Sequence, residues 1–155
     1  MSEVIPSGLP ASALQQAARR SERMAEQARL LGQGLAFPPR IGGDGRLEWA
    51  VGEASITDAI TVILGTNPGE RIGLPRFGAG LDRFLFEGNN AGTHARIAEA
   101  IATALKAGEP RIQLESISVE ADPTSPETAL ATIQWRLVAS AAAGRATVSV
   151  PVGRG

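Results

Sequence analysis

The chain has 155 residues, enough for one domain with a sizeable core and too few for two ordinary domains. Hydrophobic residues make up 43% of it and charged residues 20%, which excludes a globally disordered protein. Fifteen basic and sixteen acidic residues leave a net charge of -1. This balance argues against a dedicated nucleic-acid binder, because such proteins carry a basic surface.

Two residue counts limit the available chemistry. The chain has no cysteine, which excludes disulfides, thiolate metal ligands and cysteine nucleophiles. Its one histidine, His94, is too few for a multi-histidine zinc or iron site. His94 falls near the start of a predicted helix, where a charged imidazolium would face the unfavourable end of the helix dipole. We therefore expect a surface histidine without a catalytic role, and no metal or cofactor.

Neither a secretory signal nor a membrane span is expected. Residues 1–31 contain no apolar run of the kind that a secretory signal needs, and no stretch approaches the ~20 apolar residues that span a bilayer. The sequence therefore predicts a protein that is made in the cytoplasm and has no membrane segment.

The N-terminal part, residues 1–34, is predicted to contain an arm and a helix. Residues 1–10 hold two prolines and a glycine, typical of a flexible arm, whereas Ser12–Leu31 has neither residue type and favours a helix. Small and apolar residues recur along this helix at alternating three- and four-residue spacing, as in a short heptad seam. The seam either packs on the protein's own domain or docks onto a partner helix. It consists of Leu14, Ala17, Ser21, Met24, Ala28 and Leu31.

The second part, residues 35–155, is predicted to form the main domain. Seven Gly or Pro residues in Gly32–Gly45 indicate a looped linker that leads into it. In Arg46–Val51 the alternate residues Leu47, Trp49 and Val51 share one face, which predicts a short strand.

Two amphipathic helices follow. The first begins at Ser55, with Asp58 three residues later as in a capping box, and ends at Leu64 before Gly65. The second spans Thr93–Ala107. Their apolar faces consist of Ile56, Ala59, Ile60, Ile63 and Leu64 in the first helix, and of Ile97, Ile101, Ala104 and Leu105 in the second.

The last third of the chain predicts β structure, in strands spanning Ile112–Ala121, Ala129–Ala139 and Arg145–Val152. In the middle strand Ala131, Ile133, Trp135 and Leu137 share one face. Pro151 cannot donate to a β-ladder, so the last strand is expected at a sheet edge. The predicted fold class is α+β, a small and mostly antiparallel sheet covered by helices on one face, with an additional N-terminal helix.

Two carboxylates, Glu70 and Glu109, are candidates for a glycosidase pair. Each is closely followed by an arginine, Arg71 or Arg111, and a neighbouring cation favours the ionised carboxylate. Since a general acid must be protonated, structural ion pairing is the preferred interpretation of both.

Two segments have more distinctive sequences than a simple connecting loop requires. Gly65–Gly92 holds nine Gly or Pro residues in 28 positions, and a long irregular stretch inside a compact domain is usually functional. Glu109-Pro110-Arg111 lies between the second helix and the first of the three strands. With the Ser55–Leu64 helix, the turn Gly69-Glu70-Arg71 and the stretch Pro75-x-Phe77-Gly78, it resembles the phage W-protein-like baseplate wedge family of contractile tails, over about residues 35–152.

The resemblance implies a structural, non-enzymatic role in the baseplate of a phage tail, a type VI secretion system or an extracellular contractile injection particle. Partners would be the wedge proteins and the sheath protein, with the inner tube or spike-hub proteins as further candidates, in six copies per baseplate. Glu109, Pro110 and Arg111 would engage the helical core of the wedge, and Gly69, Glu70, Arg71, Pro75, Phe77 and Gly78 would form a structural loop.

The last strand would pair with strands of the first sheath ring and so initiate the sheath, through Arg145, Thr147, Val148, Ser149 and Val150. Such templating suits an open sheet edge, because main-chain hydrogen bonds then supply the affinity. Arg145 and Arg154 would place a charge at each end of this strand. Two alternatives remain: a cell-wall-cleaving, lysozyme-like enzyme, and an unrelated α+β adaptor domain.

Overall fold

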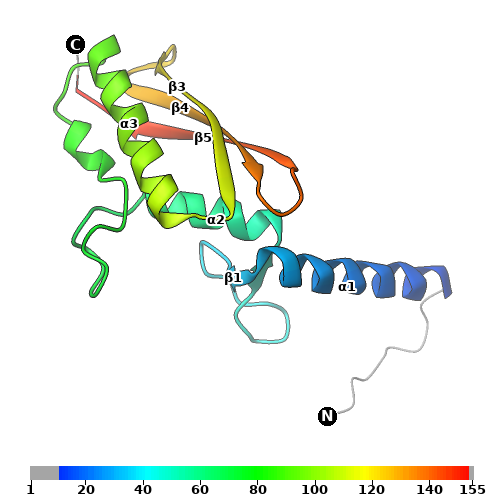
Figure 1. Ribbon diagram of the computed structural model, residues 1–155. Helices are drawn as coiled ribbons and strands as arrows, with labels where there is room; N and C mark the ends of the chain where they lie inside the picture. Colours follow the sequence, from blue (N-terminus) through cyan, green and yellow to red (C-terminus); the bar gives the residue numbers. More distant parts are fainter. Residues whose placement is uncertain (1–10, 154–155) are drawn as a thin grey trace.

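A three-stranded antiparallel sheet carries the core of the protein. In the computed structural model, which describes residues 11–153, the strands β3 (Ile112–Asp122), β4 (Ser125–Leu137) and β5 (Ala143–Pro151) lie in the order β3-β4-β5. The helices α2 (Glu53–Leu64) and α3 (Ala91–Gly108) pack on the sheet (Figure 1). The predicted α+β class with an additional N-terminal helix is therefore confirmed.

Alternation along β4 sets which face of the sheet is buried. Ala131, Ile133, Trp135 and Leu137 are all buried, while Gln134 and Arg136 between them are exposed. This is the face predicted from the sequence, and it packs against the apolar faces of both helices. The core consists mainly of Ile56, Ile60, Ile63 and Leu64 of α2, Ile97, Ile101 and Leu105 of α3, the β4 residues, and Val150 of β5.

The hairpin between β3 and β4 is tighter than expected. The expected connection of seven residues shrinks to a short turn, because Thr124 donates to the Asp122 carboxylate from its main-chain N–H (2.8 Å) and its hydroxyl (2.6 Å). These hydrogen bonds from Thr124 lower the pKa of Asp122. A side-chain turn of this kind lets β4 begin at Ser125, four residues before the predicted start.

The capping box predicted for α2 is wrong. The helix begins two residues earlier, at Glu53, with Gly52 as the N-cap and no side-chain cap. Ser55 is buried inside the first turn, and the Asp58 carboxylate accepts the main-chain N–H of Phe37 (3.1 Å). Gly52 replaces a capping side chain because its φ of 68° needs glycine, and because a Cβ there would lie 2.8 Å from the Gln27 side chain. The end at Leu64 before Gly65 is confirmed.

A two-stranded ribbon replaces part of the predicted linker. The strand β1 (Gln33–Leu35) pairs antiparallel with β2 (Trp49–Val51). The residue of β2 that is fully buried is Ala50, which lies on the other face from Trp49, and Trp49 keeps 58% of its surface exposed. Leu47 is also exposed and lies before the strand begins. The alternation correctly indicated a strand but could not tell which face meets the rest of the protein.

The helix α3 follows the prediction closely. Its N-cap is Asn90, whose side chain accepts the N–H of Thr93 (3.1 Å). The predicted apolar residues of its buried face are all confirmed as buried. Before it, the irregular stretch contains one short 3₁₀ helix, η1 (Leu81–Phe84), whose Leu81 and Phe84 join the core.

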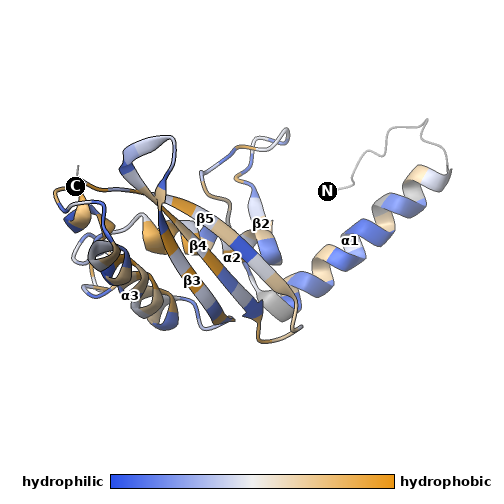
Figure 2. Ribbon diagram, turned by 90° about the horizontal axis from the view of Figure 1, so that it is seen from above, coloured by the Kyte–Doolittle hydropathy of each residue, from blue (hydrophilic) through white to orange (hydrophobic). Residues whose placement is uncertain are grey.

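The first helix, α1 (Ala11–Leu31), extends away from the sheet and the other helices (Figures 1 and 2). Of its seam, Ser21 and Met24 are exposed and Ala28 is half-buried. The first of the two sequence interpretations, packing along its own domain, is therefore wrong for this part of the helix. The side chains of Leu14, Ala17 and Leu31, the arm at residues 1–10 and Arg154 lie outside the described part of the chain.

Within residues 11–153, no helix combines the length and apolar character that crossing a membrane requires.

Candidate interaction site

The helix-to-sheet junction is built on an ion pair. The helix α3 ends at Gly108, and the Glu109 side chain turns inward with only 3% of its surface exposed. Its carboxylate accepts two hydrogen bonds from the Arg111 guanidinium, at 2.7 Å from Nε and 2.5 Å from Nη2, and a third from the Arg111 main-chain N–H (3.2 Å). Pro110 lies between them and is exposed. The sequence-based preference for ion pairing at Glu109 agrees with this geometry.

Arg111 also links distant parts of the chain. Its Nη1 approaches the Ser55 hydroxyl of α2 (3.4 Å), and a Cβ at Gly32, just after α1, would lie 3.7 Å from the same nitrogen. Hydrogen bonding to Glu109 raises the pKa of Arg111 above its ordinary value, against an opposing effect of burial. Arg111 is therefore a fixed positive charge between α2, the start of the sheet and the segment that follows α1.

The loop after α2 is closed by a different set of hydrogen bonds. The Glu70 carboxylate accepts the Asn67 main-chain N–H (2.9 Å) and side-chain amide (3.1 Å), and the same amide donates to Asp82 (2.7 Å). Gly69 has a φ of 94°, and Gly78 a φ of 106°. A Cβ at Gly78 would lie 2.2 Å from the Thr66 carbonyl oxygen, so any other residue there would require the Thr66 main chain to move.

The expected pairing of Glu70 with Arg71 is wrong. Arg71 instead lies over the ring of Phe77, with its guanidinium carbon 4.1 Å from the ring centre, which is the geometry of a cation–π contact. Adjacent residues in a turn point in different directions, so sequence neighbours did not predict spatial partners here. Pro75 lies nearby in the same loop but is exposed.

A cavity of about 320 Å³ brings the two sequence motifs together. Arg71 and Phe77 line it from the loop, Glu109 and Arg111 from the junction, and Gln33, Gly34 and Phe37 from β1 and the segment after it. Ser55, Asp58, Ala59, Val62 and Ile63 of α2 complete its wall, with Gly108. The sequence did not predict that β1, Ser55 and Asp58 line this site. Ser55 and Asp58 are held there by contacts with residues more than 20 positions away.

The two carboxylates considered for hydrolysis do not share this cavity. Glu109 lines it, whereas Glu70 is bonded to Asn67 outside it. His94 is half-buried and bonded through Nε2 to Asn89 Oδ1 (2.6 Å), so it is less exposed than predicted. In the described part of the chain, no three acidic or histidine side chains gather closely enough to hold a metal ion.

The strand β5 lies at one edge of the sheet, as Pro151 indicated. Its register with β4 runs without a bulge from Thr128↔Pro151 to Arg136↔Ala143. The N–H of Val152 donates to the main-chain carbonyl of Glu127 in β4 (2.9 Å), and the N–H of Gly153 donates to the main-chain carbonyl of Glu87 on the opposite side (2.7 Å).

Main-chain groups alternate sides along a strand, which fixes the direction of each residue of β5. The N–H and C=O groups of Gly144, Ala146, Val148 and Val150 face β4. Those of Arg145, Thr147 and Ser149 face away from the sheet. No strand within residues 11–153 pairs with the outer side of β5. The side chains divide likewise, since Val148 and Val150 join the core while Arg145, Thr147 and Ser149 are exposed.

Comparison with known proteins gives the family. The sequence pattern of baseplate wedge protein gp25 matches residues 50–142, more than half of the chain. The protein belongs to this family. The matched range contains α2, the loop, α3, the Glu109–Arg111 junction, β3 and β4. The resemblance inferred from the sequence is confirmed.

Solved structures agree with the assignment to the gp25 family. A chain of the cryo-EM structure of the anti-feeding prophage (AFP) baseplate, determined with 6-fold symmetry, is 31% identical, with a TM-score of 0.66 over 72% of this chain and 88% of that one. The crystal structure of a candidate tail lysozyme from Geobacter sulfurreducens is 28% identical, with a TM-score of 0.58 over 64% of this chain and 90% of that one. No curated protein sequence matches the chain. As a gp25 family member, the protein is a structural baseplate component of a contractile tail or contractile injection system.

Proposed function

We propose that this gp25 family member joins the baseplate wedge to the first sheath ring and starts the sheath by pairing β5 with a sheath strand. The observation that carries the proposal is the outer edge of β5, where Arg145, Thr147 and Ser149 have main-chain donors and acceptors facing away from β4. An incoming strand can satisfy these groups without opening the domain. The side chains of Val148 and Val150 pack in the core and so hold β5 in position for this pairing.

The test uses the direction of each N–H on β5. Ser149→Pro removes an outward donor and leaves the β4 ladder intact, so wedges should assemble around the tube while sheath polymerisation fails. Ser149→Ala keeps the N–H and should give sheaths of normal length. Electron microscopy of assembled particles measures both outcomes.

A matched control lies at the opposite sheet edge. Ala121 of β3 is exposed, and the register with β4 turns its N–H away from the sheet. Ala121→Pro should leave sheath growth unchanged. Normal sheaths on a folded Ser149→Pro baseplate would contradict the proposal, as would sheath loss in Ala121→Pro alone.

The wedge is proposed to contact the junction around Pro110. Pro110 is exposed, and about a third of the Arg111 side chain reaches the surface although its guanidinium is bonded to Glu109. The internal pair would fix the backbone that presents Pro110. Glu109 would therefore support the contact with the wedge without touching the wedge itself. The loop of Gly69, Glu70, Arg71, Pro75, Phe77 and Gly78 would form the adjoining wall, because Arg71 and Phe77 line the same cavity.

The protein is proposed to have no enzymatic activity. The two candidate carboxylates do not share a cavity, and each is engaged in the fold, Glu109 by Arg111 and Glu70 by Asn67. The purified protein should therefore leave a peptidoglycan suspension turbid. Clearing that disappears in Glu70→Gln or Glu109→Gln would instead establish the lysozyme-like alternative, which the name of one structural neighbour also suggests.

The same proposal includes the assembly as a whole. Six copies would surround the tube, after synthesis in the cytoplasm, with wedge and sheath proteins as direct partners and inner-tube or spike-hub proteins nearby. Residues 1–34 would act as an arm and helix apart from the wedge domain at residues 35–155, although β1 crosses this boundary by pairing with β2.

A further inference from the structure

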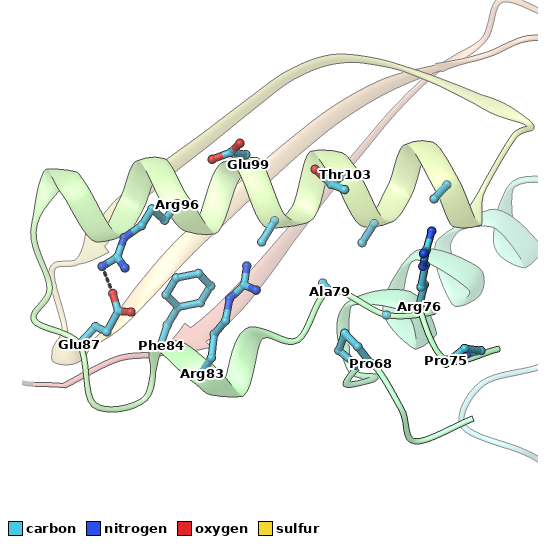
Figure 3. A pocket seen from close by; sticks show the side chains of 14 residues that line it. Pro68, Pro75, Arg76, Ala79, Arg83, Phe84, Glu87, Arg96, Glu99 and Thr103 are labelled. Atoms are coloured by element: carbon cyan, nitrogen blue, oxygen red, sulfur yellow. Dashed lines mark hydrogen bonds and ion pairs between the residues drawn. The ribbon is translucent and has the colours of Figure 1, made fainter. Parts of the chain in front are cut away.

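A second groove runs along α3, and no residue of β5 lines it. It encloses about 750 Å³ between α3 and the segment from Pro68 to Glu87, and it shares no lining residue with the cavity at Glu109 and Arg111 (Figure 3). One wall consists of small side chains of α3, among them Ala100 and Ala104. Phe84 lines the facing wall.

The groove has an excess of positive charge. Figure 3 shows Arg76 and Arg83 pointing from the loop wall toward α3, while Glu99 points away from them. The charge of Arg96 is balanced, because its guanidinium is bonded to Glu87. Within residues 11–153, neither the Arg76 nor the Arg83 guanidinium has a hydrogen-bond or ion-pair partner; Arg83 only lies over the Phe84 ring, 4.8 Å from its centre.

The walls of the groove carry small side chains. They come from Ala79 on the loop and from Ala100, Thr103 and Ala104 on α3, and they leave room for an approaching main chain. The groove continues past Pro75 and Arg76 into a further cavity of about 270 Å³ beside Leu74, which is half exposed. This further cavity shares Phe77 and Gly108 with the cavity at the junction. From Arg96 to Ala107, α3 runs for roughly 16 Å at ~1.5 Å per residue. Roughly five residues of extended chain fit this length at ~3.3 Å each.

We propose that this groove binds a short acidic segment of a neighbouring baseplate chain, with Asp or Glu carboxylates on Arg76 and Arg83. An arginine fork binds a carboxylate through two parallel hydrogen bonds, and the Phe84 ring holds the Arg83 side chain in position for it. Apolar side chains beside the carboxylates pack on the alanine wall and on Leu74. No residue of β5 takes part in this contact, so an experiment can contradict it without contradicting sheath initiation, and the reverse.

The binding test uses the full chain and twelve-residue fluorescent peptides that tile the baseplate proteins encoded with it. Fluorescence anisotropy should identify peptides in which Asp or Glu is flanked by apolar residues. Their affinity should fall at least tenfold in the double variant Arg76→Met, Arg83→Met, which keeps the aliphatic stems and the cover over Phe84. The matched control is Arg40→Met, an exposed arginine outside the groove, which should leave binding unchanged.

Three further measurements with the same binding assay complete the test. Replacing the peptide carboxylate by its amide should abolish binding, and 0.5 M salt should weaken it strongly because the charges lie at the surface. Inorganic phosphate at equal concentration should not displace the peptide, since a free anion lacks the apolar contacts. The proposal is overturned if no peptide binds, if the double variant binds as well as wild type, or if phosphate competes equally.

Assembly provides a second, independent measurement. Arg76→Glu should prevent incorporation into baseplates while its melting temperature stays near that of wild type, and a Glu→Lys change in the bound partner segment should restore incorporation. Incorporation of Arg76→Glu at wild-type level would contradict the proposal even if sheath initiation by β5 were correct.

Discussion

At the scale of single residues, two glycines of the loop after α2 have different reasons to be glycine. Both have positive φ, at 94° for Gly69 and 106° for Gly78. A Cβ at Gly69 would meet nothing within 4 Å, whereas one at Gly78 would collide with the main chain of Thr66. The first position is limited by backbone conformation alone, and the second by space as well.

Alanine at the two positions should therefore have unequal effects. Gly69→Ala should cost about 1–2 kcal/mol of unfolding free energy, the strain of a non-glycine residue at positive φ. Gly78→Ala should cost clearly more, because the Thr66 carbonyl must also move. Urea denaturation of both variants measures the difference, and equal losses would contradict this account of the loop.

The ion pair at the junction should behave as a buried one. Arg111→Ala leaves the carboxylate of Glu109 inside the protein without its cation, and we expect a loss of about 3 kcal/mol. The figure is at the low end for buried pairs because about a third of the Arg111 side chain reaches water. Because hydrogen bonding to Glu109 raises the pKa of Arg111, its charge and this contribution persist throughout the pH range in which a free arginine is charged, and they are lost only at still more alkaline pH.

A surface pair provides the control for that measurement. Arg136 pairs with Glu115 where both side chains are exposed, so Arg136→Ala should cost less than ~1 kcal/mol. A double-mutant cycle on Glu109 and Arg111 separates their coupling from other losses. If Arg111→Ala melts like Arg136→Ala, the junction does not depend on the pair for stability. That result would instead favour a role for Arg111 in contacting a partner during assembly.

At the scale of elements, β5 has two chemically different sides. Residues with even numbers bond to β4, and those with odd numbers from Arg145 to Ser149 present free main-chain groups. An exposed edge of this kind recruits other strands, and Pro151 limits it because proline has no N–H. The element is therefore both part of the core and a surface for pairing.

Proline at neighbouring positions of β5 should separate these two properties. Val148→Pro removes a bond to β4 and leaves a buried carbonyl at Ala131 unpaired, a loss of about 1–3 kcal/mol before any packing change. Ser149→Pro removes only a donor that faces away, so the isolated protein should lose much less. Thermal melting of both proteins decides this, and the reverse order would mean that the inferred directions of the N–H groups are wrong.

At the scale of the whole molecule, the core and α1 are nearly independent. The core joins α2, α3, η1 and the sheet, whereas α1 meets the rest near Gly52, where Gln27 lies against the helix start. Figures 1 and 2 both show α1 leaving the domain along its length. Stability should therefore come almost entirely from the domain that follows it.

Removal of most of α1 tests this division. A chain that starts at Gln27 keeps the contact with Gly52 and should melt within about 4 °C of the full chain, which corresponds to less than ~1 kcal/mol for a domain of this size. Calorimetry on both chains measures it. A drop of 10 °C or more would show that the helix is part of the folding unit after all.

The sequence by itself determined the elements whose periodicity records burial. The spacing of Ile97, Ile101 and Leu105 defined α3, and the alternation around Ile133 and Trp135 defined β4 and its inner face, because each pattern reports contact with one core. Pro151 likewise revealed an edge strand through chemistry local to one residue. The order of the loop and junction motifs was sufficient to indicate the family.

Only the tertiary structure decided what these residues touch. Ser55 looked like a helix cap because its neighbours fit that pattern, yet it is buried beside Arg111, 56 positions away. Glu70 and Arg71 are adjacent in sequence but bind Asn67 and Phe77 instead of each other. Partners far apart in sequence meet only when the helices and sheet pack, so no local pattern records which of them will share a cavity.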